Sequence, residues 1–183
     1  MRALASLAVA LLLAMAAPLP ARAADPALDR LFERLAAARG GAESQAIEAE
    51  IWQAWTLGGG PAASSLMRIG IGALAGGNLP AALGVFDAVV KQNPEFAEGW
   101  NKRATVLFLM GALDAAAEDC ERVLKLEPRH FGALSGLAMI RMRQDRVDEA
   151  IAAFEKALAL HPHLDGAKAN LDTLRRRRRD GAI

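Results

Sequence analysis

Two stretches decide the fold, AEGWNKRATVLFLMGALDAAAEDCERVLKLEP at residues 97–128 and FGALSGLAMIRMRQDRVDEAIAAFEKALALHP at residues 131–162. Each stretch ends on a proline, and a third proline lies upstream at the same spacing. Intervals of 34 residues separate Pro94, Pro128 and Pro162. Matches at one fixed period indicate a repeat architecture. We therefore predict three repeats of 34 residues.

Each repeat is predicted to contain two helices joined by a short break. Apolar residues recur at spacings of three and four on both sides of the break, which is the pattern of a helix with one buried face. Proline ends the second helix because it cannot donate the next backbone hydrogen bond. The breaks are Gly76-Gly77-Asn78, Gly111-Ala112 and Gln144-Asp145-Arg146. The predicted fold class is all-α.

Small and large residues occupy fixed places in this period. Small residues are expected where helices cross, and large ones between neighbouring helices. The small set is Gly70, Ala82, Ala104, Ala116, Ala138 and Ala150, and the large set is Trp100, Phe86 and Phe154. In this pattern residues 63–162 resemble the tetratricopeptide repeat (TPR) family. The resemblance implies a right-handed TPR solenoid of helical hairpins, with units at 63–96, 97–130 and 131–164.

Four positions depart from the family pattern. Arg103 and Arg141 stand where the family has a large apolar side chain, Cys120 replaces an aromatic residue, and Ala73 replaces a bulky one. A long arginine stem can cover apolar surface while its charged group stays in water or against an acid. Cys120 is expected to be a small buried hydrophobic residue.

Helical segments also flank the repeats. Residues 24–62 contain two amphipathic stripes around Gly40-Gly41, which predicts an N-terminal helical hairpin, either a degenerate repeat or a cap. The sequence Gly58-Gly59-Gly60-Pro61 follows it, where a terminating proline would be expected. Residues 165–183 predict a C-terminal capping helix with an arginine-rich tail, because open repeat stacks require a polar cap.

The N-terminus has the features of a secretory signal peptide. Arg2 precedes an apolar run over residues 4–17, and Ala21-Arg22-Ala23 fits the A-x-A cleavage pattern. We expect a signal peptide over 1–23, cleavage after Ala23, and a periplasmic or secreted protein. An uncleaved membrane anchor is the alternative, for which the apolar run is short.

The composition offers few groups for catalysis. Of 183 residues 53% are hydrophobic and the net charge is +1, with one cysteine, three histidines and no tyrosine. One cysteine cannot form an internal disulfide, and little remains for acid–base or metal chemistry. The near-neutral charge also disfavours a nucleic-acid binder. We expect no enzymatic activity, no cofactor and no metal.

Three features could nevertheless suggest chemistry. The hexapeptide that begins at Gly70 matches the dinucleotide pattern G-x-G-x-x-G/A, but no strand precedes it. His161 and His163 form a pair without a third ligand and are expected on the surface of an inter-repeat loop. Ser135 lacks the context of a catalytic nucleophile.

The first helices of stacked hairpins line an inner groove. By resemblance to the family, the predicted partner-binding residues are Met67, Ile71, Leu74, Asn101, Thr105, Phe108, Ser135, Met139 and Met142. Methionines adapt to varied apolar partners, which favours an apolar helical or extended peptide. The alternative is that the three methionines pack against the neighbouring hairpin and line nothing.

One well-known ligand of the family is not expected. Its clamp for acidic chaperone tails needs lysine and asparagine on the first repeat, and lysine and arginine on the third. Those places hold Met67, Ile71, Gly132 and Gly136 in this sequence.

The sequence thus predicts a non-catalytic adaptor that binds a protein or peptide through an apolar, methionine-containing groove. A second hypothesis rests on the unbroken run Arg175 to Arg179, which could dock an anionic surface of lipid or nucleic acid. Such a run points all round a helix and suits a solvated tail as well. Nucleic acid is not expected as the partner, and membrane contact is possible but not favoured. The sequence determines neither the partner nor the oligomeric state.

Overall fold

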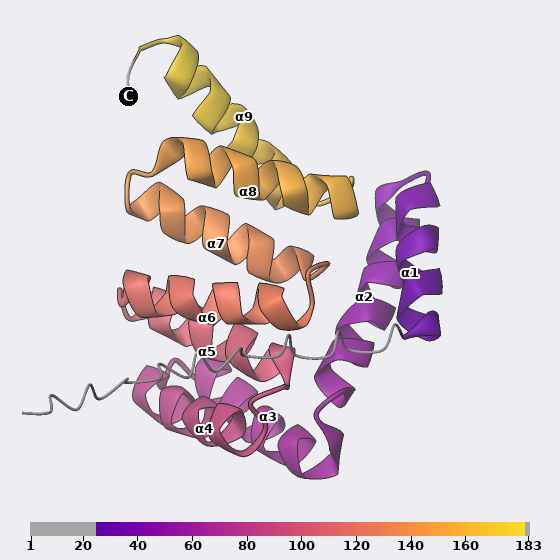
Figure 1. The fold of residues 1–183 in the computed structure, drawn as a ribbon, viewed down its shortest axis with the longest axis vertical. Coiled ribbons are helices and arrows are strands. Elements are labelled where there is room, and N and C mark those ends of the chain that lie inside the picture. The colour runs from indigo at the N-terminus through magenta and orange to yellow at the C-terminus, as the bar shows by residue number, and fades with distance from the viewer. Residues whose placement is uncertain (1–24, 182–183) are drawn as a thin grey trace, which may run out of the picture.

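The computed structural model describes residues 25–181, so the predicted signal peptide lies outside the described residues. Every regular element within 25–181 is an α-helix, which confirms the all-α prediction. Figure 1 shows α3 to α9 stacked in successive layers, with α1 and α2 alongside the stack. The helices are α1 (Pro26–Ala37), α2 (Gly41–Leu57), α3 (Gly60–Ala75), α4 (Leu79–Gln92), α5 (Ala97–Leu109), α6 (Leu113–Leu126), α7 (Phe131–Arg143), α8 (Val147–Leu160) and α9 (Asp165–Arg179).

The same turn closes the first helix of each of the three repeats. It needs one residue with positive φ, and this residue is Gly77 at 73°, Gly111 at 82° or Asp145 at 58°. Glycine adopts this conformation without a Cβ penalty, and aspartate tolerates it better than most residues. In the first repeat the next backbone N–H, that of Asn78, donates to the Ala73 carbonyl at 2.9 Å. These turns lie at the breaks predicted from the sequence.

Close approach of the two helices in a repeat depends on a small residue. A Cβ at Gly70 would lie 2.6 Å from the ring of Phe86, so glycine is required there. Phe86 is fully buried, as expected for a residue that fills the layer between helices. The equivalent pairs in the next two repeats are Ala104 with Cys120 and Ala138 with Phe154.

The two unusual arginines join neighbouring layers through ion pairs. The Arg103 guanidinium lies 2.7 Å from Asp119 on α6 and 3.0 Å from Asp87 on α4. Arg141 on α7 contacts Glu121 on α6 at 2.9 Å. The expectation that these arginines set their charged groups against acids is confirmed.

The N-terminal hairpin, α1 and α2, packs across the edge of the stack where the inter-repeat loops lie (Figure 1). Phe131, at the start of α7, is fully buried, and its ring centroid lies 5.0 Å from Trp55 and 6.4 Å from Phe32. The hairpin therefore does not stack on α3 as a preceding repeat would. Ile69, the counterpart of Arg103 in the first repeat, is consequently 57% exposed.

The expectation of a surface histidine at position 161 is wrong. His161 is 1% exposed, and its Nε2 lies 3.1 Å from a Glu48 carboxylate oxygen on α2. His163 Nε2 lies 3.0 Å from the Ala38 carbonyl oxygen. The loop residues are covered because the hairpin folds back onto this edge, a contact between segments more than a hundred residues apart.

Two glycine substitutions should have opposite effects on stability. A Cβ at Gly132 would lie 2.5 Å from the Trp52 ring, which Trp55, His130 and Phe131 hold in place. Gly132→Ala should therefore destabilise the protein by about 1–3 kcal/mol through overpacking. A Cβ at Gly72 would have no neighbouring atom within 4 Å, so Gly72→Ala should stabilise α3 by about 0.5–1 kcal/mol. Urea unfolding measures both, and a stable Gly132→Ala variant would contradict the hairpin position.

The thiol of Cys120 should be unreactive until the protein unfolds. Burial raises its pKa to about 12, with a further contribution from Asp119. At pH 8 a thiol reagent should label the folded protein far more slowly than the urea-unfolded chain, because only the thiolate reacts. Between pH 9 and 12 the unfolded chain loses this proton and the folded one keeps it, so stability should fall as pH rises. Cys120→Ala should remove this fall in stability at alkaline pH and should itself cost about 1 kcal/mol through lost packing. Rapid labelling of the folded protein would show that Cys120 is not buried.

Candidate functional site

The inner surface of the stack consists of equivalent residues on α3, α5 and α7. The nine predicted groove residues form three rows in which neighbours are 34 residues apart. The first row is Met67, Asn101 and Ser135, the second is Ile71, Thr105 and Met139, and the third is Leu74, Phe108 and Met142. The three rows differ in exposure, which decides what each can contact.

The second row is open to a partner. Ile71 is 38% exposed and Met139 is 42% exposed, and both rank among the large exposed apolar side chains of residues 25–181. Thr105 lies between them and is also exposed, with its hydroxyl donating to the Asn101 carbonyl at 3.0 Å. This row is the part of the prediction that the structure leaves accessible.

The third row is half-buried and carries a cation at its centre. The Arg143 guanidinium lies 5.0 Å from the centroid of the Phe108 ring and also donates to the Phe108 carbonyl at 3.1 Å. Such a stacked cation is attracted by the face of the ring. Leu74 and Met142 pack against the cores of their own repeats.

The first row does not face a groove, and the prediction is wrong for Met67 and Asn101. Met67 is 1% exposed because it fills the space between α3 and α5, in one cluster with Phe86 and Phe96. Asn101 is 8% exposed, and its amide donates to Glu98 at 2.9 Å. Ser135 is half-buried, and its hydroxyl oxygen has no hydrogen-bond partner within residues 25–181.

The N-terminal hairpin covers the beginnings of α5 and α7. The Lys102 ammonium lies 5.2 Å from the centroid of the Trp52 ring, and that ring also rests on Gly132. The accessible part of the inner surface is therefore the middle of the helices. In the sequence, this contact is indicated by two tryptophans three residues apart on α2, Trp52 and Trp55.

A buried polar network lies beneath the hairpin. One carboxylate oxygen of Glu98 accepts from Asn101 at 2.9 Å and lies 3.1 Å from His130 Nε2. The other oxygen lies 2.9 Å from the Lys102 ammonium, in ion-pair contact without the geometry of a directed hydrogen bond. His130 Nδ1 accepts a hydrogen bond from the Ala133 backbone N–H. The ring proton is therefore on Nε2, which donates a hydrogen bond to Glu98.

This network keeps Glu98 charged although it is buried. Burial raises the pKa of Glu98, but the His130 hydrogen bond and the Lys102 charge outweigh it, and the net pKa is lowered. The His130 ring also stacks on Trp55, with centroids 4.0 Å apart and planes at 9°. Neither His130 nor Glu98 was singled out from the sequence, because no local motif marks a contact of α2 with α5 and with the loop before α7.

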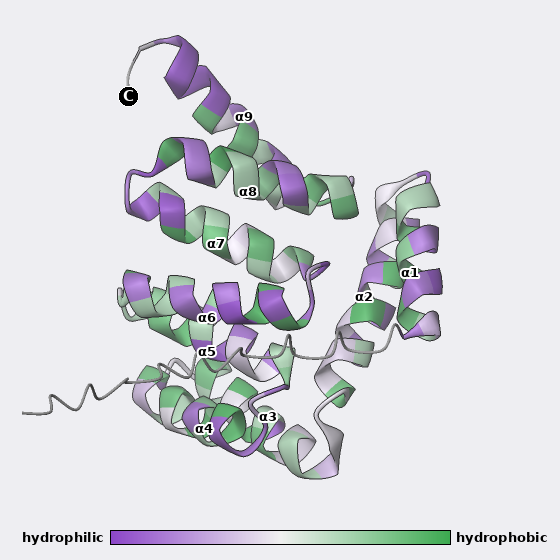
Figure 2. Cartoon of the chain, in the orientation of Figure 1, coloured by the Kyte–Doolittle hydropathy of each residue, from purple (hydrophilic) through white to green (hydrophobic). Residues whose placement is uncertain are grey.

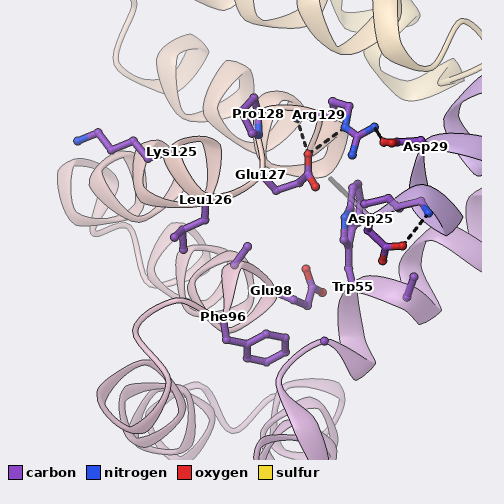
Figure 3. Close-up of a pocket in the computed structure, with 14 residues that line it drawn as sticks. Asp25, Asp29, Trp55, Phe96, Glu98, Lys125, Leu126, Glu127, Pro128 and Arg129 are labelled. Carbon is purple, nitrogen blue, oxygen red and sulfur yellow. Dashed lines mark hydrogen bonds and ion pairs between the residues drawn. The ribbon is translucent and has the colours of Figure 1, made fainter. Parts of the chain in front are cut away.

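A pocket of about 470 Å³, the edge pocket, opens between the hairpin and the inter-repeat loops (Figure 3). It is lined by the N-terminal part of α1, the end of α2, the beginning of α5 and the loop after α6. Trp55, Phe96, Glu98 and Glu127 form much of its wall. No local pattern in the sequence marks this pocket, since its four segments meet only in the folded chain.

Within residues 25–181, no set of three or more histidine, cysteine, aspartate or glutamate residues is arranged to hold a metal ion. None of the helices in the same range is sufficiently long and apolar to cross a membrane.

Comparisons with known proteins agree on one family. Family models described as tetratricopeptide repeat match residues 67–126 and 107–171, which together make up more than half of the 183-residue chain. A TPR repeat-containing protein of Rhizobium etli is 41% identical over 113 residues, or 62% of this chain and 55% of that protein. The chain thus spans about half the length of this relative.

Solved structures show the same fold. The Arabidopsis OM64 TPR domain has a TM-score of 0.61 at 24% identity and covers 63% of this chain and 95% of its own. The Sgt2 TPR domain from Aspergillus fumigatus has a TM-score of 0.64 at 23% identity, with 67% and 83% covered. The second TPR domain of human RPAP3, in complex with the HSP70 peptide SGPTIEEVD, has a TM-score of 0.59 at 21% identity, with 62% and 94% covered. With these matches, the repeat spacing and the stacked hairpins place the chain in the tetratricopeptide repeat family.

Proposed function

We propose that this protein is a non-catalytic adaptor that binds a protein or peptide on the inner surface formed by α3, α5 and α7. The observation that carries the proposal is the exposed row Ile71, Thr105 and Met139, which repeats at the spacing of the fold. Exposed apolar side chains on rigid helices are typical of interaction surfaces. Met139 and Phe108 serve as the apolar anchors, and Arg143 adds a cation beside them.

The partner is an apolar helical or extended segment that also carries an acid for Arg143. An acidic chaperone tail like the HSP70 peptide of the RPAP3 complex is a poor candidate. The basic residues such a tail would need are absent, since the corresponding places hold Met67, Ile71, Gly132 and Gly136. Met67 is also buried, and Gly132 lies under Trp52.

The proposed site of action is the periplasm or the exterior of the cell, on the strength of the signal-peptide pattern over 1–23. Mass spectrometry of the protein from its host tests this, because cleavage after Ala23 would leave Ala24 as the first residue.

The second hypothesis, an anionic surface docked by Arg175 to Arg179, has weaker support. Figure 2 shows the C-terminal half of α9 as strongly hydrophilic. However, Arg175 pairs with Glu155 at 2.7 Å and Arg178 with Asp148 at 3.3 Å, both on α8. Two of the five arginines are thus held against α8 and serve the packing of the last helix.

Substitutions in the inner surface should weaken binding without unfolding the protein. Met139→Ala and Phe108→Ala should each cost roughly 1–3 kcal/mol of binding free energy, because central apolar anchors dominate such interfaces. Met110→Ala is the matched control, since Met110 is 46% exposed but lies outside the three rows. Calorimetric titration with a purified partner, at low and high salt, measures these effects.

Removal of residues 175–183 from the same protein tests the second hypothesis. Under the proposed function this deletion should change the affinity little at either salt concentration. Loss of binding on deletion, a steep salt dependence and unchanged binding by Met139→Ala would together contradict the inner-surface site and favour the anionic surface.

A further inference from the structure

The edge pocket is lined by more acids than bases. Asp25, Asp29, Glu98 and Glu127 contribute carboxylates, while Lys125 and Arg129 contribute the only cations among its lining residues. In Figure 3 the carboxylates of Glu98 and Glu127 lie on opposite sides of the pocket. The Glu98 side chain is fully buried and already paired with Lys102, so Glu127 is the acid that can receive a positively charged group.

One polar group in the pocket wall has no partner among residues 25–181. Trp55 is 8% exposed, and its buried indole N–H donates to none of these residues. A buried donor without an acceptor costs free energy, and such groups in a folded protein call for an explanation. Figure 3 shows the indole beside the pocket, with its nitrogen on the side of the ring toward the two carboxylates. A ligand that brings a carbonyl oxygen to this position would satisfy the indole N–H.

Glu127 has spare capacity to bind such a ligand. Only 9% of the residue is exposed, and one of its carboxylate oxygens accepts from the backbone and side chain of Arg129, at 3.1 and 3.2 Å. A carboxylate can accept about four hydrogen bonds. The second oxygen, which receives none from the described residues, remains available for a cationic donor.

The protein already binds one guanidinium with this chemistry. Arg129 lies between Glu127 and Asp29, at 3.2 and 2.6 Å, with its guanidinium 4.7 Å from the centroid of the Phe32 ring. The pocket beside it offers the same chemistry, with Glu127 as the acid and Trp55 and Phe96 as aromatic walls. Aromatic faces attract cations, and apolar walls suit the aliphatic stem of a basic side chain.

We propose that the edge pocket is a second binding site, which takes a lysine or arginine side chain of a peptide on the free oxygen of Glu127 and the peptide carbonyl on the Trp55 N–H. The site lies on the edge of the stack under the N-terminal hairpin. It does not depend on the proposed function of the inner surface, and either site can fail without the other.

Nuclear magnetic resonance of the indole N–H groups tests this site directly. The probes are N-acetyl-arginine amide and N-acetyl-lysine amide, with N-acetyl-glutamate amide and N-acetyl-leucine amide as controls. The basic probes should shift the Trp55 signal saturably and leave that of Trp100 in place, with the Trp55 signal assigned from Trp55→Phe. n-Butylguanidine has the same single guanidinium charge but no carbonyl, so it should bind several-fold more weakly.

Variants separate the charge from the fold. Glu127→Gln should lower the affinity for the basic probes by about tenfold, the size expected for a charged hydrogen bond. Glu118→Gln, an exposed carboxylate elsewhere on α6, should not change it. Trp55→Phe removes the indole N–H, so its affinity is measured by calorimetry, and the acetylated probes should weaken to the level of n-butylguanidine. Circular dichroism confirms that each variant remains folded.

Three results would overturn the proposal. The first is the absence of a saturable Trp55 shift with either basic probe. The second is an equal response to the glutamate or leucine probe, and the third is unchanged affinity in Glu127→Gln. Binding of n-butylguanidine as tight as that of the acetylated probes would overturn the contact between the carbonyl and Trp55. Met139→Ala should bind the basic probes normally, which keeps this test separate from that of the inner surface.

Discussion

Burial of each helical hairpin against its neighbours is the constraint on which the rest of this structure depends. A hairpin has apolar residues on more than one side, so it is stable only within the stack. The close contact of Gly70 with the Phe86 ring shows how tightly the two helices of one layer must fit. Arg103 then ties α5 to both α4 and α6 through Asp87 and Asp119. Rigid layers of this kind hold the exposed inner row at fixed spacing.

The N-terminal hairpin uses its apolar face in a different way. Trp52, Trp55 and Phe32 pack around Phe131 and His130 at the edge of the stack, and Ile69 on α3 stays exposed. The three aromatic rings bury a large apolar area at this edge, against Phe131 and His130. The hairpin thereby limits the accessible part of the inner surface to the middle of the helices. It also forms one wall of the edge pocket.

The two candidate sites have different physical characters. The inner surface presents Ile71, Met139 and the Phe108–Arg143 stack, which suit an apolar segment with an acidic residue. The edge pocket presents carboxylates and aromatic walls, which suit a basic side chain. A single partner with both features could contact both surfaces, since the hairpin and α5 border each of them.

The sequence by itself determined the repeat, its turns and the buried state of Cys120. These features depend on local periodicity and on residues such as Gly77 and Pro94, whose backbone preferences act where they stand. It also identified the exposed row of Ile71 and Met139, because the family frame assigns helix faces. Only the tertiary structure decided that Met67 is core, that His161 is buried, and that Glu98, His130 and Trp55 meet. These contacts join segments far apart in the chain, and which edge an aromatic hairpin covers depends on shape and burial that no local pattern encodes.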